Sequence, residues 1–347
     1  MMINWNDFQQ LCKRELALCK VKPGETVIVL SQGSDRMDYA DAFVTAAIEL
    51  GAQSYNLRLG NTASVLNGPG LSEVGINPLA NNPGAMEALK QADLVVDLVF
   101  MLWSEEQHEI QRAGARVLTC IEPKGLLAQM FPTEDQRRRV EFSSGLISQA
   151  KTMRITSKAG TDVTYQLGAF PVVEQYGYTD QKGRWDAWPG GFVFTAGAVD
   201  GVDGTVVIDA GDIIAGPFRS YVDSKIELTI AGGQITRIDG GVDAEQMKAY
   251  LDGFNDPRAY AISHIGWGIN ENVSWTSMKS NTHSYGQEAR AYYGNVLFAT
   301  GPNTELGGVN DTPAHMDIPL RNCTLYLDDQ AILVDGEFVL PELKVSR

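Results

Sequence analysis

The segment from Asn303 to Asn322, NTELGGVNDTPAHMDIPLRN, contains the residues most able to do chemistry. It includes His315 and Asp317 as an H-x-D, in a chain with only four histidines among 347 residues. In an extended segment residues i and i+2 point to the same face, so this imidazole and this carboxylate can converge on one ion. A mixed nitrogen and oxygen pair suits iron, zinc or manganese. The competing interpretation is a solvated aspartate beside a hydrogen-bonded core histidine.

A third ligand must come from elsewhere in the chain. His264 lies in AISHIGWGIN, between apolar residues and before two glycines, which predicts a strand that ends in a tight turn. Its imidazole is therefore either a metal ligand or a core histidine bonded to a backbone carbonyl. His283 lies in a polar stretch and is expected to be exposed. His108 begins an H-E-x-x pattern on an amphipathic helix, but Arg112 stands where a zincin needs its second histidine.

Together, His264, His315 and Asp317 supply two imidazoles and one carboxylate. Such a set can occupy one face of an octahedron and leave positions open for substrate and dioxygen, as in non-heme Fe(II) oxygenases. It can equally hold a catalytic zinc with a bound water. The ligand types alone do not choose between oxygen chemistry and hydrolysis.

Composition excludes several classes of protein. The chain is 44% hydrophobic and 20% charged, as in ordinary globular proteins, and its net charge of -15 argues against nucleic acid or an anionic membrane as the main partner. No apolar run reaches the roughly 18 residues of a membrane helix, and the N-terminus lacks the pattern of a signal peptide. Four cysteines without C-x-x-C spacing fit a reducing compartment. We therefore expect a cytoplasmic protein.

Two domains are expected to position these residues. Residues 1–150 alternate helical patterns with short apolar runs such as TVIVLS, LVVDLVF and RVLTCIE, which predicts an α/β domain with a parallel sheet. The turn SQGSDRMD has one glycine where a dinucleotide fingerprint needs three, and no GxxxxGK[ST] is present. A nucleotide cofactor is therefore not indicated.

After residue 150 the pattern changes. Residues 151–347 hold 24 of the 35 glycines and alternating runs such as KIELTIAGGQITRIDGG. These features predict a mostly antiparallel, barrel-like β domain of α+β type, with one helix near residues 244–254. All three candidate ligands lie in this part, which we expect to be the metal-binding catalytic domain.

Tryptophans offer candidate walls for a pocket. Trp185 and Trp188 lie in GRWDAWPGG, and Trp267 follows His264 by three residues. Each indole could stack on an aromatic substrate, although burial in the core is the ordinary fate of tryptophan.

Several of these blocks together resemble one family. SHIGWGIN, GNVLFATGPNTELGG and TPAHMDIPLRNC, with GRWDAWPGG upstream, resemble the 2,5-dihydroxypyridine 5,6-dioxygenase family over nearly the whole chain. The resemblance implies an extradiol-like ring-cleavage dioxygenase of pyridine catabolism, as in nicotinate degradation. It further implies that one Fe(II) is bound by His264, His315 and Asp317, and that the protein is a homo-oligomer.

The family is a distant relative of thermophilic-aminopeptidase-type metallopeptidases, which carry two metals. Leu297 replaces a metal-binding histidine of those peptidases, so a second metal is poorly supported. The dioxygenase family also has a histidine within W-D-x-W and another near Trp103; this chain has Ala187 and Ser104 there. The group that transfers protons and the exact ring substrate therefore stay open.

Two further residues are candidates for catalysis. Arg290 could neutralise developing oxyanion charge or a substrate carboxylate, or form a surface ion pair with Glu288 or another acid. Glu305 could orient a ligand histidine or take a proton, or cap glycine amides as a structural carboxylate. Ser104 is a candidate substrate contact.

Two alternative functions stay open. One is a mononuclear zinc or manganese hydrolase that acts on a peptide or cyclic amide. The other is a catalytically silent oligomeric protein that binds a heteroaromatic ligand and leaves it unchanged.

Overall fold

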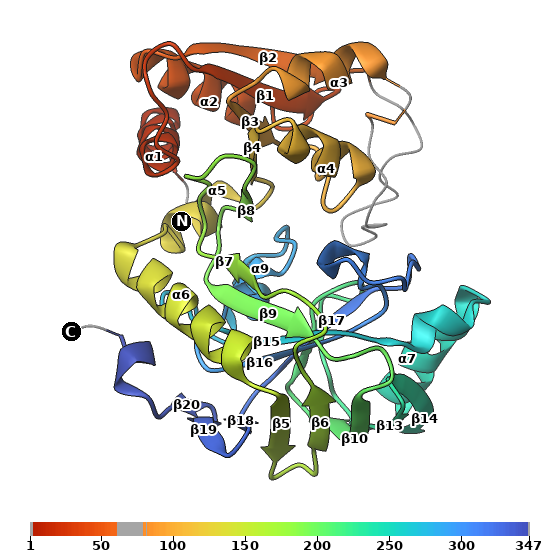
Figure 1. Ribbon diagram of the computed structural model, residues 1–347. Coiled ribbons are helices and arrows are strands. Elements are labelled where there is room, and N and C mark those ends of the chain that lie inside the picture. The colour runs from red at the N-terminus through yellow and green to blue at the C-terminus, as the bar shows by residue number, and fades with distance from the viewer. Residues whose placement is uncertain (1–2, 61–78, 81, 346–347) are drawn as a thin grey trace. The chain divides into compact units, whose positions relative to one another are not determined.

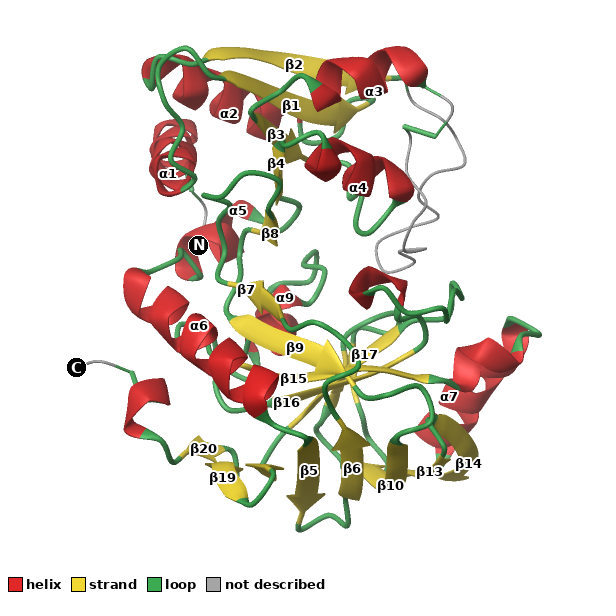
Figure 2. Cartoon of the chain, in the orientation of Figure 1, coloured by secondary structure: helices red, strands yellow, loops and turns green. Residues whose placement is uncertain are grey.

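The computed structural model describes residues 3–60, 79–80 and 82–345. Figures 1 and 2 show the chain by position and by secondary structure. Contacts divide it into two compact units, each made of two segments: Met1–Pro132 with Gln175–Gly190, and Thr133–Glu174 with Gly191–Arg347. This division differs from the expected boundary at residue 150. Helix α6 belongs to the second unit, and the segment that begins at Gln175 returns to the first.

The first unit is the expected α/β domain. Its five strands pair in the order β2-β1-β3-β4-β8, and neighbouring strands run parallel to one another. Strand β8 was not expected here, because its three residues come from the tryptophan segment far along the chain. The elements are α1 (Trp5–Leu18), β1 (Thr26–Gln32), α2 (Met37–Glu49), β2 (Gln53–Leu59), α3 (Pro83–Lys90), β3 (Leu94–Asp97), α4 (Glu105–Arg112), β4 (Arg116–Thr119), α5 (Lys124–Gln129) and β8 (Trp185–Ala187).

Helices cover both faces of this sheet, which explains its continuous apolar strands. On one face Ile28, Val95 and Val117 form a core with residues of α3 and α4. On the other, α2 packs against β1 and β2, and α1 packs on α2. Strand β3 ends at Asp97, earlier than its apolar run predicts, because this buried carboxylate accepts hydrogen bonds from three backbone N–H groups that follow it.

The second unit consists mainly of antiparallel sheets, as expected. An eight-stranded sheet has the order β14-β13-β10-β6-β5-β18-β19-β20, and a five-stranded sheet has the order β17-β16-β15-β9-β7. Both orders are open in the described part of the chain, so the barrel-like closure that we expected is not confirmed. The helices are α6 (Glu134–Gln149), α7 (Val242–Gly253), α8 (Ser277–Ser280) and α9 (Gln287–Arg290), of which α7 matches the helix expected near residues 244–254.

The strands of the second unit are short and bounded by turns. They are β5 (Thr152–Ser157), β6 (Asp162–Gln166), β7 (Val173–Gln175), β9 (Phe192–Ala196), β10 (Val202–Ile208), β11 (Ile213–Ile214), β12 (Ser220–Tyr221), β13 (Ile226–Ala231), β14 (Gln234–Gly240), β15 (Ile262–Gly268), β16 (Val296–Thr300), β17 (Met316–Leu320), β18 (Cys323–Leu327), β19 (Gln330–Val334) and β20 (Glu337–Phe338). Strands β15, β16 and β17 are buried along their whole length. Strands β15 and β17 contain the candidate ligands His264 and Asp317, and β16 pairs with both of them.

Candidate metal centre

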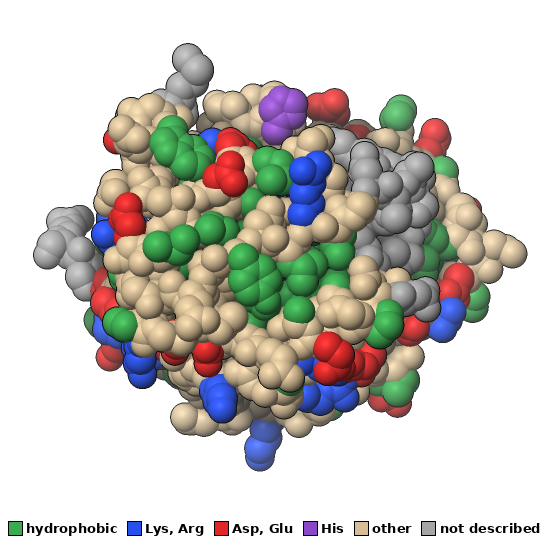
Figure 3. Space-filling model, turned by 90° about the horizontal axis from the view of Figure 1, so that it is seen from above, with side chains coloured by type: hydrophobic (Ala, Val, Ile, Leu, Met, Phe, Trp, Pro, Cys, Tyr) green, Lys and Arg blue, Asp and Glu red, His purple; other side chains and the backbone are tan. Residues whose placement is uncertain are grey.

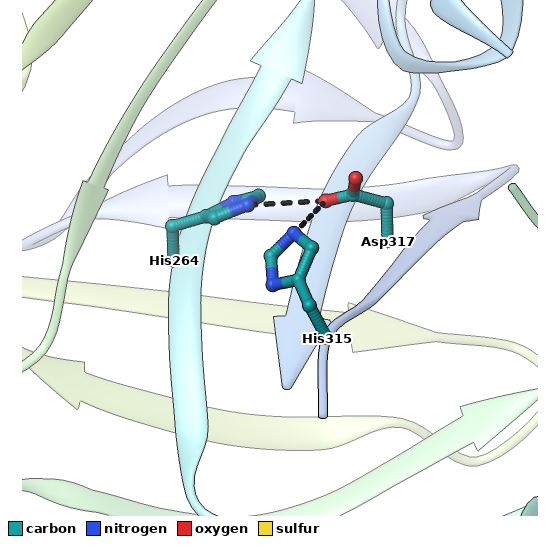
Figure 4. A group of neighbouring side chains, drawn as sticks. All are labelled: His264, His315 and Asp317. Carbon is teal, nitrogen blue, oxygen red and sulfur yellow. Dashed lines mark ion pairs between the residues drawn. The ribbon is translucent and has the colours of Figure 1, made fainter. Parts of the chain in front are cut away.

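Three neighbouring strands of the five-stranded sheet build the site. His264 lies in β15, Asp317 lies in β17, and His315 immediately precedes β17 (Figure 4). Strand β16 runs between them and places Ala299 opposite Asp317. Because the alanine side chain is small, longer side chains from the two flanking strands can meet above it.

A β-bulge brings His264 to the correct face. The register between β15 and β16 shifts between Ile262 and Ile265, so the two residues between them lie opposite the single residue Ala299. In regular register His264 would point to the opposite face of the sheet. The extra residue returns its imidazole to the face that carries Asp317, as bulges beside functional sites often do.

The three side chains converge closely. Nε2 of His264 lies 3.0 Å from Oδ1 of Asp317, and Nε2 of His315 lies 3.4 Å from the same oxygen. All three ligand atoms lie within 4.8 Å of one another. His264 and Asp317 are buried, with 3% and 4% of their surface exposed.

Phe194, which the sequence did not single out, supports the His264 ring. The two ring centroids are 4.8 Å apart, and Phe194 lies in β9, opposite Gly266 of β15. At Gly266 a Cβ would lie only 1.9 Å from the Val193 carbonyl oxygen, so glycine allows the two strands to approach. The sequence did not predict this contact, because Phe194 is one apolar residue among others in an apolar strand.

Arg290 pairs with the ligand aspartate. Its Nε donates to Oδ2 of Asp317 at 2.6 Å, and its Nη1 donates to the Tyr285 carbonyl oxygen at 2.6 Å. The alternative ion pair with Glu288 is not the contact that the structure gives, since Glu288 accepts from the Ser284 hydroxyl at 2.7 Å.

The charges of the site reinforce one another. Burial opposes ionisation of Asp317, but the Arg290 guanidinium and the His315 imidazole more than offset it and hold the pKa of Asp317 well below its usual value. Burial alone would lower the pKa of His315, yet the Asp317 carboxylate beside its ring raises it. Asp317 is therefore a carboxylate at neutral pH, the form that binds cations.

Glu305 contributes a second carboxylate to this environment. It lies in a 3₁₀ turn, Thr304–Leu306, and both of its side-chain oxygens are buried without a hydrogen-bond partner. Burial raises its pKa, and the positive charge of His264 and His315 in their protonated forms opposes that rise. A buried, unpaired carboxyl group costs stability and is therefore a strong candidate for function.

The donor set fits a divalent transition-metal ion. Asp317 Oδ1 is buried and has no well-formed hydrogen bond, although two imidazole nitrogens lie near it. Nδ1 of each histidine is also buried without a partner. Two imidazoles and one carboxylate oxygen are the donors that iron, zinc and manganese accept, and a cation among them would satisfy the unpaired oxygen.

Comparison with known proteins places this centre in a family. The profile described as 2,5-dihydroxypyridine 5,6-dioxygenase matches residues 7–340. A curated protein of that name from Pseudomonas putida KT2440 is 44% identical over 342 residues, which cover 97% of each chain. The chain belongs to the 2,5-dihydroxypyridine 5,6-dioxygenase family. The solved structure of the 2,5-dihydroxypyridine dioxygenase from Pseudomonas putida KT2440 agrees, with a TM-score of 0.95, 42% identity and 99% of both chains covered.

The family fold is also aminopeptidase-like. AmpT from Thermus thermophilus matches 96% of this chain and 99% of its own with a TM-score of 0.61 at 14% identity, which shows a shared fold alone. Leu297, the residue expected where the peptidases have a metal-binding histidine, is fully buried in β16. Within the described part of the chain, no helix combines the length and apolarity needed to cross a membrane.

Two of the tryptophans expected to bind the family's substrate are packed in cores. Trp267 is fully buried, and its Nε1 donates to the Ser143 hydroxyl at 3.1 Å. Trp188 is 1% exposed, and its Nε1 donates to the Leu127 carbonyl at 3.2 Å. Neither indole has a free face in its own unit, so their contacts support packing.

Trp185 and Ser104 lie in the first unit of this dioxygenase-family chain. Trp185 is half-buried; its Nε1 donates to the Thr119 hydroxyl at 2.9 Å, and its ring contacts Trp103 edge-on at 5.9 Å. Ser104 is buried and caps α4, because its hydroxyl accepts from the Gln107 N–H at 3.2 Å. Both have structural roles, and the Trp185 ring retains some exposed surface.

Proposed function

We propose that the chain is an Fe(II)-dependent, extradiol-like dioxygenase that cleaves the ring of a hydroxylated N-heteroaromatic such as 2,5-dihydroxypyridine. Membership of the dioxygenase family supports the reaction class. The observation that carries the proposal is the convergence of His264, His315 and Asp317 on one buried point. Two imidazoles and one carboxylate are the ligands that leave an octahedral Fe(II) open on one face.

The protein's part in the reaction is to bind, orient and exclude water. His264, His315 and Asp317 would hold Fe(II), which supplies open positions where a ring hydroxyl and dioxygen can meet and exchange electrons. Phe194 keeps the His264 ring oriented by packing against it. His264 and Asp317 are buried and the His315 side chain is 11% exposed, so little bulk water reaches the ligand atoms.

Glu305 is the proposed proton acceptor for the substrate hydroxyl. The two positions where the family resemblance leads us to expect a histidine hold Ser104 and Ala187, so neither supplies an imidazole that could take the proton. Glu305 interacts electrostatically with all three ligands, and neither of its buried oxygens has a hydrogen-bond partner. A carboxyl group whose pKa burial has raised is better matched to proton transfer near neutral pH.

Trp185, which is half-buried and donates through its indole to Thr119, and Ser104, which caps α4, stay predicted substrate contacts that rest on the sequence alone. We do not extend the proposal to Trp188 and Trp267, whose burial assigns them to packing. The homo-oligomeric state expected from the family stays a prediction.

The test is oxygen consumption by anaerobically Fe(II)-loaded protein with 2,5-dihydroxypyridine, with loss of aromatic absorbance followed in parallel. We expect one dioxygen consumed per ring lost, no turnover in His315→Ala or Asp317→Ala, and full turnover in His283→Ala, which changes an exposed histidine outside the cluster. Glu305→Gln should bind iron normally but turn over about 100-fold more slowly. Amide hydrolysis by a zinc-loaded protein, with no oxygen uptake, would instead support the hydrolase.

A further inference from the structure

Asp317 presents its two oxygens to different partners. Oδ1 lies toward the two imidazoles, at 3.0 and 3.4 Å, whereas Oδ2 accepts the Arg290 Nε–H at 2.6 Å. We propose that Arg290 is a positioning residue that restricts Asp317 to one-oxygen coordination of the metal. This inference rests on the proposed function, because it assumes that the cluster binds a metal ion.

The backbone that carries Arg290 is tied to the strands that carry the ligands. Asn295, fully buried, donates from Nδ2 to the carbonyl oxygens of Ala289 at 2.7 Å and of Arg290 at 3.0 Å. Its Oδ1 accepts the Gly268 N–H at 2.6 Å, at the end of β15. The end of α9 is therefore fixed to the strand that holds His264. This fixes the backbone position from which the Arg290 side chain extends.

Close packing also limits where the guanidinium can go. A Cβ at Gly286 would lie 3.4 Å from Nη1 of Arg290 and 3.2 Å from the Ala215 side chain, and Gly286 has a φ of +88° that favours glycine. A Cβ at Gly216 would lie 3.5 Å from Nη2. The Ala215 N–H also donates to the Asp317 carbonyl at 2.8 Å, which fixes the backbone of this ligand.

The number of open positions depends on how Asp317 binds. A carboxylate can ligate a metal through one oxygen or through both. If Asp317 binds an octahedral metal ion through one oxygen beside the two imidazoles, three positions stay open. If it binds through both oxygens, only two positions stay open. A ring hydroxyl and dioxygen together take two positions, so a third position is available to a second substrate atom or a water molecule. Because Oδ2 is already bonded to Arg290, it is withheld from the metal and the third position stays open.

The experiment uses Co(II) as a redox-stable probe of the metal centre. We would measure the Co(II) dissociation constant and the visible absorption of bound Co(II) for wild type, Arg290→Gln, Arg290→Lys and Arg219→Gln. Arg219 is the matched control, because it bonds to the Thr282 carbonyl and the Ser284 hydroxyl of the same segment and to no ligand. Loss of the guanidinium in Arg290→Gln should weaken Co(II) binding about 10–100-fold, as loss of other partners of metal ligands does.

The spectrum distinguishes positioning from general stability. In Arg290→Gln the freed oxygen should reach the metal and change the Co(II) absorption bands, whereas Arg219→Gln should match wild type in both measurements. Arg290→Lys keeps a positive charge that can bond to Oδ2 but lacks the separate Nε and Nη1 donors that hold Asp317 and Tyr285, so its affinity should lie between those of wild type and the glutamine variant. If Arg290→Gln does not fold, the lysine variant decides the question.

Two failures have different meanings. If wild type does not bind Co(II), the proposed metal centre itself is wrong. If wild type binds Co(II) and the folded Arg290 variants keep its affinity within about twofold and its spectrum unchanged, the metal centre stands and the role given to Arg290 is wrong.

Discussion

At the scale of single residues, protons and metal compete for the same imidazole. Burial lowers the pKa of His315, but the neighbouring Asp317 carboxylate raises it above the usual 6.5 overall. An imidazole binds metal only when it is deprotonated. We therefore expect the Co(II) affinity to fall as the pH is lowered from about 8 to about 6, and the loss to begin above the usual pKa of histidine.

The stability of the metal-free protein should change with pH in the opposite direction to its affinity for Co(II). A raised folded-state pKa for His315 contributes stability that is fully present below the unfolded pKa and is lost as the pH rises through the folded value. Acidification thus favours the metal-free fold and weakens the metal complex. The rise in Tm caused by Co(II) should shrink as the pH falls from about 8 to about 6. A rise of constant size would contradict this linkage, and His315→Ala provides the baseline without metal.

Single residues also show what the sequence could and could not predict. The spacing of His315 and Asp317 correctly predicted that both would reach one point, because i and i+2 share a face in an extended strand. The partner of Arg290 was not predictable, since it depends on where a four-residue helix packs. Trp188 and Trp267 show a different limit of prediction. A tryptophan in the sequence can line a pocket or pack in a core, and only the structure shows that these two are buried.

At the scale of elements, the centre depends on an irregular strand. The sequence predicted a strand ending near His264, but nothing local announced the extra residue that turns this imidazole toward Asp317. Bulges arise from pairing with a distant strand, here β16, whose position a single segment does not encode. For the same reason the sequence did not predict that β8 would extend the parallel sheet.

The close approach of β15 and β9 gives a test of this element. In Gly266→Ala the new methyl would lie 1.9 Å from the Val193 carbonyl and 2.8 Å from the Phe194 side chain, so the strands must separate. We expect a loss of about 1–3 kcal/mol of unfolding free energy by urea denaturation, together with weaker Co(II) binding because His264 and Phe194 move apart.

Gly145→Ala is the matched control for this substitution. Gly145 is exposed within α6, in the same unit, and a Cβ there meets no atom within 4 Å. This variant should gain about 0.5–1 kcal/mol and leave Co(II) binding unchanged. Equal stability of the Gly266 and Gly145 variants would show that the two strands tolerate a wider spacing.

At the scale of the whole molecule, composition predicted the class of each unit better than the boundary between them. The parallel and antiparallel sheets follow from apolar runs and alternating runs respectively. The division by contacts differs from the expected boundary at α6, because the sequence of an amphipathic helix does not say which unit it packs against. Its place is decided by distant contacts, in which Arg139 bonds to the Ile269 carbonyl and Ser143 accepts from Trp267.

Net charge acts on the molecule as a whole. The excess of acidic residues gives -15, yet Figure 3 shows acidic and basic side chains interspersed on the face that it draws. On this face no large patch of a single sign is offered to a polyanion.

All proposed ligands and Arg290 belong to the second unit, so metal should stabilise that unit selectively. Hydrogen exchange measured by mass spectrometry should slow on addition of Co(II) in peptides that cover β15, α9 and β17. Amides in the buried strands β1 and β3 of the first unit should keep their rates, because no ligand lies there and local opening is governed by local contacts. His315→Ala, treated identically, should show no metal effect. Equal protection in both units would mean that they open together, and the free energy of metal binding would then be shared by the entire chain.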